Sequence, residues 1–241
     1  MAVRTQLGLV GALLAAAAVG WGWTVGELRG MDEGPWTALG AFGWFAVVWL
    51  VMMAAMMLPS VAPTVVLYGR MRGSRSLFCS WVFAAGYLVT WSVIGIAAFG
   101  VSRLAGGVLD WDRAGRWISG AVLLAAALYE LSPLKDVCLG KCRSPLGFLA
   151  GAWREGPVGA LRMGTEHGVW CVGCCWALMA SLFALGAMSV AWMAFVAGLI
   201  AFEKLVPYRR AATWGTAFVL LVLGVLMLAY PDVIPGLAIP T

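Results

Sequence analysis

About seven long apolar runs constrain the fold of this chain more than any other feature of its sequence. A helix needs about 20 apolar residues to cross the hydrocarbon core of a bilayer, where its backbone amides must find partners within the segment itself. We therefore predict an all-α fold, a polytopic transmembrane helix bundle that forms a single integral membrane domain over residues 1–241. The predicted spans cover residues 7–25, 39–58, 78–101, 117–131, 158–185, 189–206 and 213–230.

The composition excludes a soluble globular protein. Hydrophobic residues make up 63% of the chain and charged residues only 11%, whereas about a quarter of the residues in a soluble domain are charged. The net charge of +5 does not indicate a nucleic-acid partner, because the basic residues lie in short connections between apolar runs. In such places they set the orientation of a membrane protein. We expect the lipid bilayer as a partner and no nucleic acid.

The basic residues also predict which ends of the spans face the cytoplasm. If the amino terminus is cytoplasmic, about three quarters of the 16 Lys and Arg residues fall on the cytoplasmic side, as the positive-inside rule requires. The spans after the first then form two groups of three with opposite topology. This arrangement permits a 1+3+3 inverted repeat of the kind found in many transporters.

The fifth apolar run carries the residues that most clearly indicate chemistry. His167, Cys171, Cys174 and Cys175 stand at i, i+4, i+7 and i+8, so at about 100° per residue they project from one side of a helix. An imidazole and three thiols on one stripe could hold a soft metal such as copper or zinc. The alternative is that the cysteines are small packing residues and that the histidine lies at the interface.

The second run contains four methionines in the segment WLVMMAAMML. Met52, Met53, Met56 and Met57 spread over about 140° of one helix face. Thioethers are uncharged, soft ligands that select Cu(I), although methionine also fills irregular gaps in any apolar core. The prolines that follow, at positions 59 and 63, are expected to bend or end this span.

The longest connection, residues 134–157, contains two further cysteines, and the segment LGK between them together with the nearby Pro133 and Pro145 predicts a constrained loop. Cys138 and Cys142 are four positions apart on the predicted cytoplasmic side, where a stable disulfide is not expected. They could receive or release a soft metal, or form a transient redox pair.

Two acidic residues stand at span ends, Glu130 in YELSPLKD and Glu203 in AFEKLVP. Each has a cationic neighbour, Lys135 and Lys204, so the simplest interpretation is interfacial ion pairing. The alternative is that carboxylates facing the interior of the bundle form an ion or proton path.

Four segments resemble a known family: MMAAMMLPS, YELSPLKDVCLGKCRSPLGFL, GVWCVGCCWALM and WMAFVAGLIAFEKLVP. Over about positions 45–210 the chain is similar to a bacterial family described as predicted metal-binding integral membrane proteins of unknown function. The resemblance implies a multi-span protein of the bacterial inner membrane with a metal site, and it implies no reaction. Glu130 departs from the family pattern, in which a polar amide is expected at that position. The implied ligands are Met52, Met53, Met56, Met57, Cys138, Cys142, Cys171, Cys174 and Cys175.

These features favour a copper-binding membrane protein that transports Cu(I) or delivers it to a metalloprotein, with zinc as the alternative metal. We expect a metallochaperone or a membrane complex as the protein partner, and binding and transfer rather than catalysis. Two other classes stay open. A membrane thiol–disulfide oxidoreductase would use Cys171 and Cys174 as a pair that exchanges with Cys138 and Cys142. A non-catalytic accessory subunit would need no metal.

Overall fold

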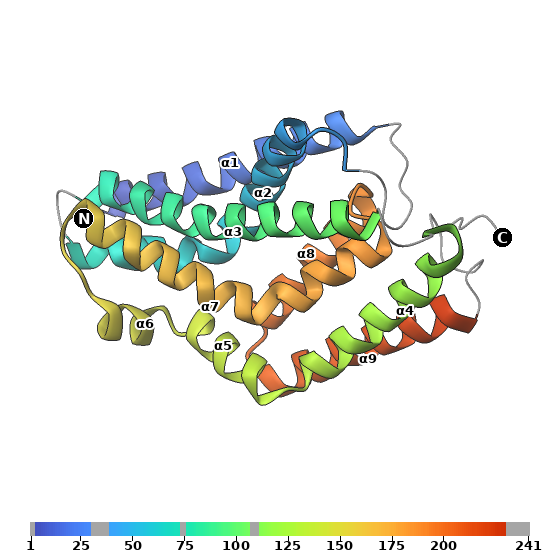
Figure 1. Ribbon diagram of the computed structural model, residues 1–241. Coiled ribbons are helices and arrows are strands. Elements are labelled where there is room, and N and C mark those ends of the chain that lie inside the picture. Colours follow the sequence, from blue (N-terminus) through green and yellow to red (C-terminus); the bar gives the residue numbers. More distant parts are fainter. Residues whose placement is uncertain (1–2, 30–38, 73–75, 107–110, 230–241) are drawn as a thin grey trace. The chain divides into compact units, whose positions relative to one another are not determined.

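The computed structural model describes residues 3–29, 39–72, 76–106 and 111–229, and within them every regular element is a helix (Figure 1). The predicted all-α fold is therefore confirmed. The end of the last predicted span, at residue 230, lies outside the described residues. The elements are α1 (Val3–Leu28), α2 (Phe42–Arg72), α3 (Ser76–Gly106), α4 (Trp111–Glu130), α5 (Pro133–Arg143), α6 (Pro145–Ala152), α7 (Gly156–Leu185), α8 (Val190–Leu205) and α9 (Arg209–Ala229).

Five of the described helices are long and apolar enough to cross a membrane, namely α1, α2, α3, α7 and α9. A sixth span results if α4 and α5 count as one, with a bend of 67° between them. The predicted span at 189–206 corresponds to α8, whose 16 residues reach about 24 Å and fall short of a hydrocarbon core of about 30 Å. The structure thus supports five or six spans by length and composition, where the sequence predicted about seven.

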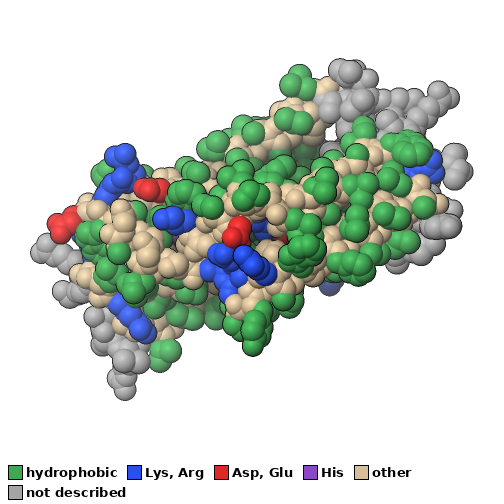
Figure 2. Space-filling model, turned by 90° about the horizontal axis from the view of Figure 1, so that it is seen from below, with side chains coloured by type: hydrophobic (Ala, Val, Ile, Leu, Met, Phe, Trp, Pro, Cys, Tyr) green, Lys and Arg blue, Asp and Glu red, His purple; other side chains and the backbone are tan. Residues whose placement is uncertain are grey.

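The surface of the described helices is compatible with membrane insertion. Figure 2 shows that hydrophobic side chains cover most of the face in view. Large apolar side chains such as Leu128 and Val158 are 74% and 80% exposed. In water such an arrangement would expose much apolar area at a cost of about 25 cal/mol per Å². Contact with lipid removes that cost.

The connection at residues 134–157 is not the predicted loop, because α5 and α6 occupy most of it. The prolines that indicated a loop stand at the first positions of these helices, Pro133 in α5 and Pro145 in α6. Proline has no amide hydrogen to donate, and its φ suits the first turn of a helix. Conversely, Pro59 and Pro63 do not end α2, which continues to Arg72.

The chain forms two compact units, and the first holds most of the cysteines. Within it α3 and α7 approach closely at two glycines. A Cβ at Gly86 would clash with the carbonyl oxygen of Leu161, and a Cβ at Gly164 would clash with that of Phe83. Small residues of this kind allow helix backbones to pack against each other in membranes. The segments of this unit are Met1–Glu27, Ala41–Ala97 and Cys138–Gly173.

The second unit is organised around two helices that run side by side, α4 and α9 (Figure 1). Gly224 of α9 permits their contact, because a Cβ there would lie 3.0 Å from the side chain of Leu124 in α4. The carboxyl end of α4 leads directly into α5, and α8 packs on α9. The segments of this unit are Leu28–Gly40, Ala98–Val137 and Cys174–Thr241.

Candidate metal centre

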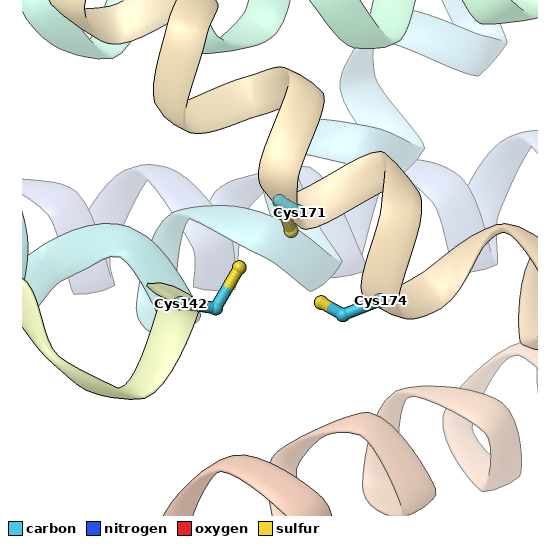
Figure 3. A group of neighbouring side chains, drawn as sticks. All are labelled: Cys142, Cys171 and Cys174. Carbon is cyan, nitrogen blue, oxygen red and sulfur yellow. The ribbon is translucent and has the colours of Figure 1, made fainter. Parts of the chain in front are cut away.

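Three cysteine sulfurs lie close enough together to share one metal ion. Cys142 at the end of α5 and Cys171 and Cys174 in α7 have Sγ atoms that all lie within 4.8 Å of one another (Figure 3). Cys174 is the first residue of the second unit, but α7 is unbroken from Gly156 to Leu185, so the helix itself holds Cys174 one turn after Cys171.

The spacing of the sulfurs fits a thiolate-bound metal. A Zn–S bond is about 2.3 Å, and three sulfurs in a plane around an ion at that distance would be about 4 Å apart. Sulfurs that all lie within 4.8 Å of one another are close to that spacing. None of the six cysteines, which all lie within the described residues, forms a disulfide.

The hydroxyl of Tyr87 in α3 contacts the centre. Its oxygen lies 3.0 Å from Cys171 Sγ, and the tyrosine is fully buried. When the sulfur is a thiolate the hydroxyl must be the donor. A metal ligand is commonly oriented by such a partner. The sequence contained no signal for this contact, because the two residues are 84 positions apart and a tyrosine in an apolar run is unremarkable.

Gly173 allows α5 to pack against α7 beside the sulfurs. A Cβ at Gly173 would lie only 2.6 Å from Cys138 Sγ and 3.3 Å from its Cβ. Gly173, which lies between the predicted ligands of α7, therefore leaves the space that the side chain of Cys138 occupies. Cys138 is buried, while Cys142, one turn later on α5, is half-buried.

Two predicted ligands of α7 lie outside the three-sulfur group. Cys175 is buried with its Sγ 3.2 Å from Cys174 Sγ. His167 is buried among aromatic rings, with its centroid 4.8 Å from that of Phe148 and 6.0 Å from that of Tyr87. The tertiary structure thus groups two of the four residues of the stripe with Cys142, and a ligand role for each of the four stays a prediction.

The four methionines of α2 are all buried, with Met53 and Met57 fully so. They belong to the first unit, which also contains Cys142 and Cys171. Burial fits both a thioether site and simple packing, because the methionine side chain is apolar and flexible. A metal-binding role for Met52, Met53, Met56 and Met57 stays a prediction.

The two predicted acidic residues share one lysine. Lys135 Nζ contacts Glu130 Oε2 and lies 2.7 Å from Glu203 Oε2, and all three residues are buried. The expectation that Glu203 pairs with its neighbour Lys204 missed this contact with Lys135. Consecutive residues of a helix point about 100° apart, so Lys204 does not face the same way as Glu203.

The chain matches the model of a known family. The model of the family PpoB2, described as copper chaperone, matches residues 46–227. This range contains the three-sulfur group, the methionines of α2 and the Glu130–Lys135–Glu203 cluster. Neither a curated protein nor a solved structure matches the chain.

Proposed function

The chain belongs to the PpoB2 family of copper chaperones, and from this premise we propose that it binds Cu(I) in the membrane at Cys142, Cys171 and Cys174 and passes it to a metalloprotein. The observation that carries the proposal is the group of three sulfurs formed by two helices, of which those of Cys171 and Cys174 are buried. The proposed location is the bacterial inner membrane, with the amino terminus in the cytoplasm.

The donor set suits Cu(I) better than the alternatives. Thiolates are soft ligands that select Cu(I), whereas magnesium and calcium require oxygen ligands. Structural zinc sites almost always have four protein ligands, and the group has three. Zinc would need a fourth donor, for which Cys175 is the nearest candidate on α7.

The unequal burial of the sulfurs supports transfer rather than storage. Cys171 and Cys174 are each 1% exposed, while Cys142 is half-buried. A copper ion can move between proteins when an accessible thiolate exchanges one ligand at a time. In the proposal Cys142 is the first ligand to meet the partner, a soluble metallochaperone or an acceptor in a membrane complex. The methionines of α2 would supply neutral sulfur ligands for movement deeper into the membrane.

The first prediction tests this site by copper stoichiometry in protein purified anaerobically with a thiol reductant. We expect about one Cu(I) per wild-type chain, bound by sulfur ligands in X-ray absorption spectra. Serine is a hard and poor ligand for Cu(I). Replacing a thiol in Cys142→Ser, Cys171→Ser or Cys174→Ser should therefore weaken binding at least tenfold.

Cys79→Ser is the matched control for this series. Cys79 is also buried, but it lies in α3 and outside the three-sulfur group. Equal loss of copper in Cys79→Ser and Cys171→Ser would contradict the assignment. A wild-type protein that takes up no copper and instead carries a titratable disulfide would favour the thiol oxidoreductase, and one with neither would favour an accessory subunit.

A further inference from the structure

The buried cluster of Glu130, Lys135 and Glu203 carries more negative than positive charge. With all three groups ionised, two carboxylates surround one ammonium group and leave a net charge of −1 away from water. Burying an uncompensated charge is expensive. One carboxylate is enough to balance the charge of the lysine. The second carboxylate could therefore be neutralised by one more positive charge.

The other charged groups near the cluster lie in half-buried or exposed positions, and they do not provide a buried positive charge that would neutralise it. Asp136 of α5 and Arg209 of α9 pair with each other at 2.9 Å in a partly exposed position. On α8, Lys204 is half-buried and points about 100° away from Glu203. Arg210 of α9 is exposed. Water screens charges in such positions.

One carboxylate oxygen is available to take the missing charge. Glu130 Oε1 is buried and has no hydrogen-bond partner among the described residues, while Oε2 contacts Lys135. A proton fits this position, because it needs no coordination sphere and turns one carboxylate into a neutral carboxyl. The cluster would then hold one carboxyl, one carboxylate and one ammonium group, with no net charge.

Helix α5 connects this cluster with the copper site. Lys135, Cys138 and Cys142 stand at i, i+3 and i+7, so they share one face of α5. Lys135 and Cys142 are separated by about 10.5 Å along the helix axis. The chain bends by 67° immediately before α5, so α5 is not a straight continuation of α4. A change in the attraction that holds Lys135 would act on the same short helix that positions Cys142.

We propose that Glu130 and Glu203 form a proton-binding site that controls, through α5, the hold of Cys142 on copper. The proposal rests on the copper site described above. When the pair is fully ionised, two carboxylates hold Lys135 and keep Cys142 beside Cys171. When one proton adds to the pair, one carboxylate becomes neutral and the attraction on Lys135 falls. Helix α5 then moves, and the bond between Cys142 and the metal weakens. Copper binding expels this proton, and copper release follows proton uptake.

The first test detects the proton without using copper. Infrared difference spectra of the copper-free protein should contain the carbonyl stretch of a neutral buried carboxyl, which disappears as the pH is raised. Glu130→Gln and Glu203→Gln each leave one carboxylate with one ammonium group, so each should lack this band. These changes keep the size of the side chain, and either variant suffices if the other does not fold.

The second test counts the protons released per Cu(I) bound in weakly buffered solution across the neutral pH range. The thiols lose protons on binding copper in every form of the protein. Wild type should release up to one proton more than Glu130→Gln. Asp136→Asn is the matched control on α5, since it removes a partly exposed charge and should behave like wild type in both tests.

The outcomes separate the two proposals. A band that is absent from wild type, or that persists in both glutamine variants, overturns the proton site even if copper binds. Equal proton release by wild type and Glu130→Gln overturns the coupling through α5. A titrating band in a protein that takes up no copper refutes the copper function, and with it the coupling, while the acid pair would still be shown to bind a proton.

Discussion

The hydroxyl oxygen of Tyr87 lies 3.0 Å from Sγ of Cys171, one of the proposed copper ligands. The second prediction is that Tyr87→Phe binds Cu(I) about tenfold more weakly, the loss typical of a removed partner of a metal ligand. The aromatic ring stays, so folding should be unaffected. Competition with a Cu(I) chelator of known affinity measures the change.

Tyr68→Phe provides the control for that substitution. Tyr68 is fully buried in the same unit, and its hydroxyl accepts a hydrogen bond from Arg72. If both variants lose copper affinity to the same extent, the effect comes from the packing of the unit, and Tyr87 does not act on Cys171.

The contact between α5 and α7 depends on the absence of a side chain at Gly173. The third prediction is that Gly173→Ala weakens copper binding and lowers the melting temperature. The new Cβ would lie 2.6 Å from Cys138 Sγ and would push α5 away from α7. Alanine favours a helix by about 1 kcal/mol over glycine, so a loss of stability must come from the clash, which typically costs about 1–3 kcal/mol.

Two further variants show whether the clash is the cause. In Gly173→Ala/Cys138→Ala the sulfur is gone, so the melting temperature should recover. Gly198→Ala in α8 introduces a Cβ that meets nothing within 4 Å and should leave stability and copper binding intact. A stable Gly173→Ala protein with normal copper affinity would show that the two helices can separate without affecting the site.

The number of membrane crossings depends on the two marginal segments, the bent pair α4–α5 and the short helix α8. The fourth prediction is that positions 104 and 208 face opposite sides of the membrane. Leu104→Cys should react with a membrane-impermeant thiol reagent from outside intact cells, and Tyr208→Cys only in inverted vesicles. The unmodified protein serves as the background for its own cysteines.

The result shows whether the number of crossings between these positions is odd or even. Opposite sides require an odd number, as when the bent pair, α7 and α8 all cross. If both residues react from the same side, one of the marginal segments turns back within the membrane. Tyr208 and Leu104 are 76% exposed, so their lack of reaction from one side would reflect the membrane and not burial in the protein.

The helical fold and part of the site were predictable because both depend on local periodicity. A run of about 20 apolar residues specifies a helix in lipid, since no other backbone can satisfy its own hydrogen bonds there. The spacing of Cys171 and Cys174 places them on one side of α7 whatever the rest of the chain does. The sequence also predicted Cys142 as a ligand, but not that it would lie beside those two.

Only the tertiary structure decided which faces meet. It brought Cys142 to the sulfurs of α7, buried His167 among aromatic rings, and set Lys135 between two carboxylates from α4 and α8. Contacts between helices depend on the packing of faces that are far apart in the chain, and glycines such as Gly173 determine how closely those faces approach. Periodicity along one helix contains no information about the face of another. The residue types of the proposed ligands could therefore be predicted from the sequence. Their grouping was decided by the packing of α5 against α7.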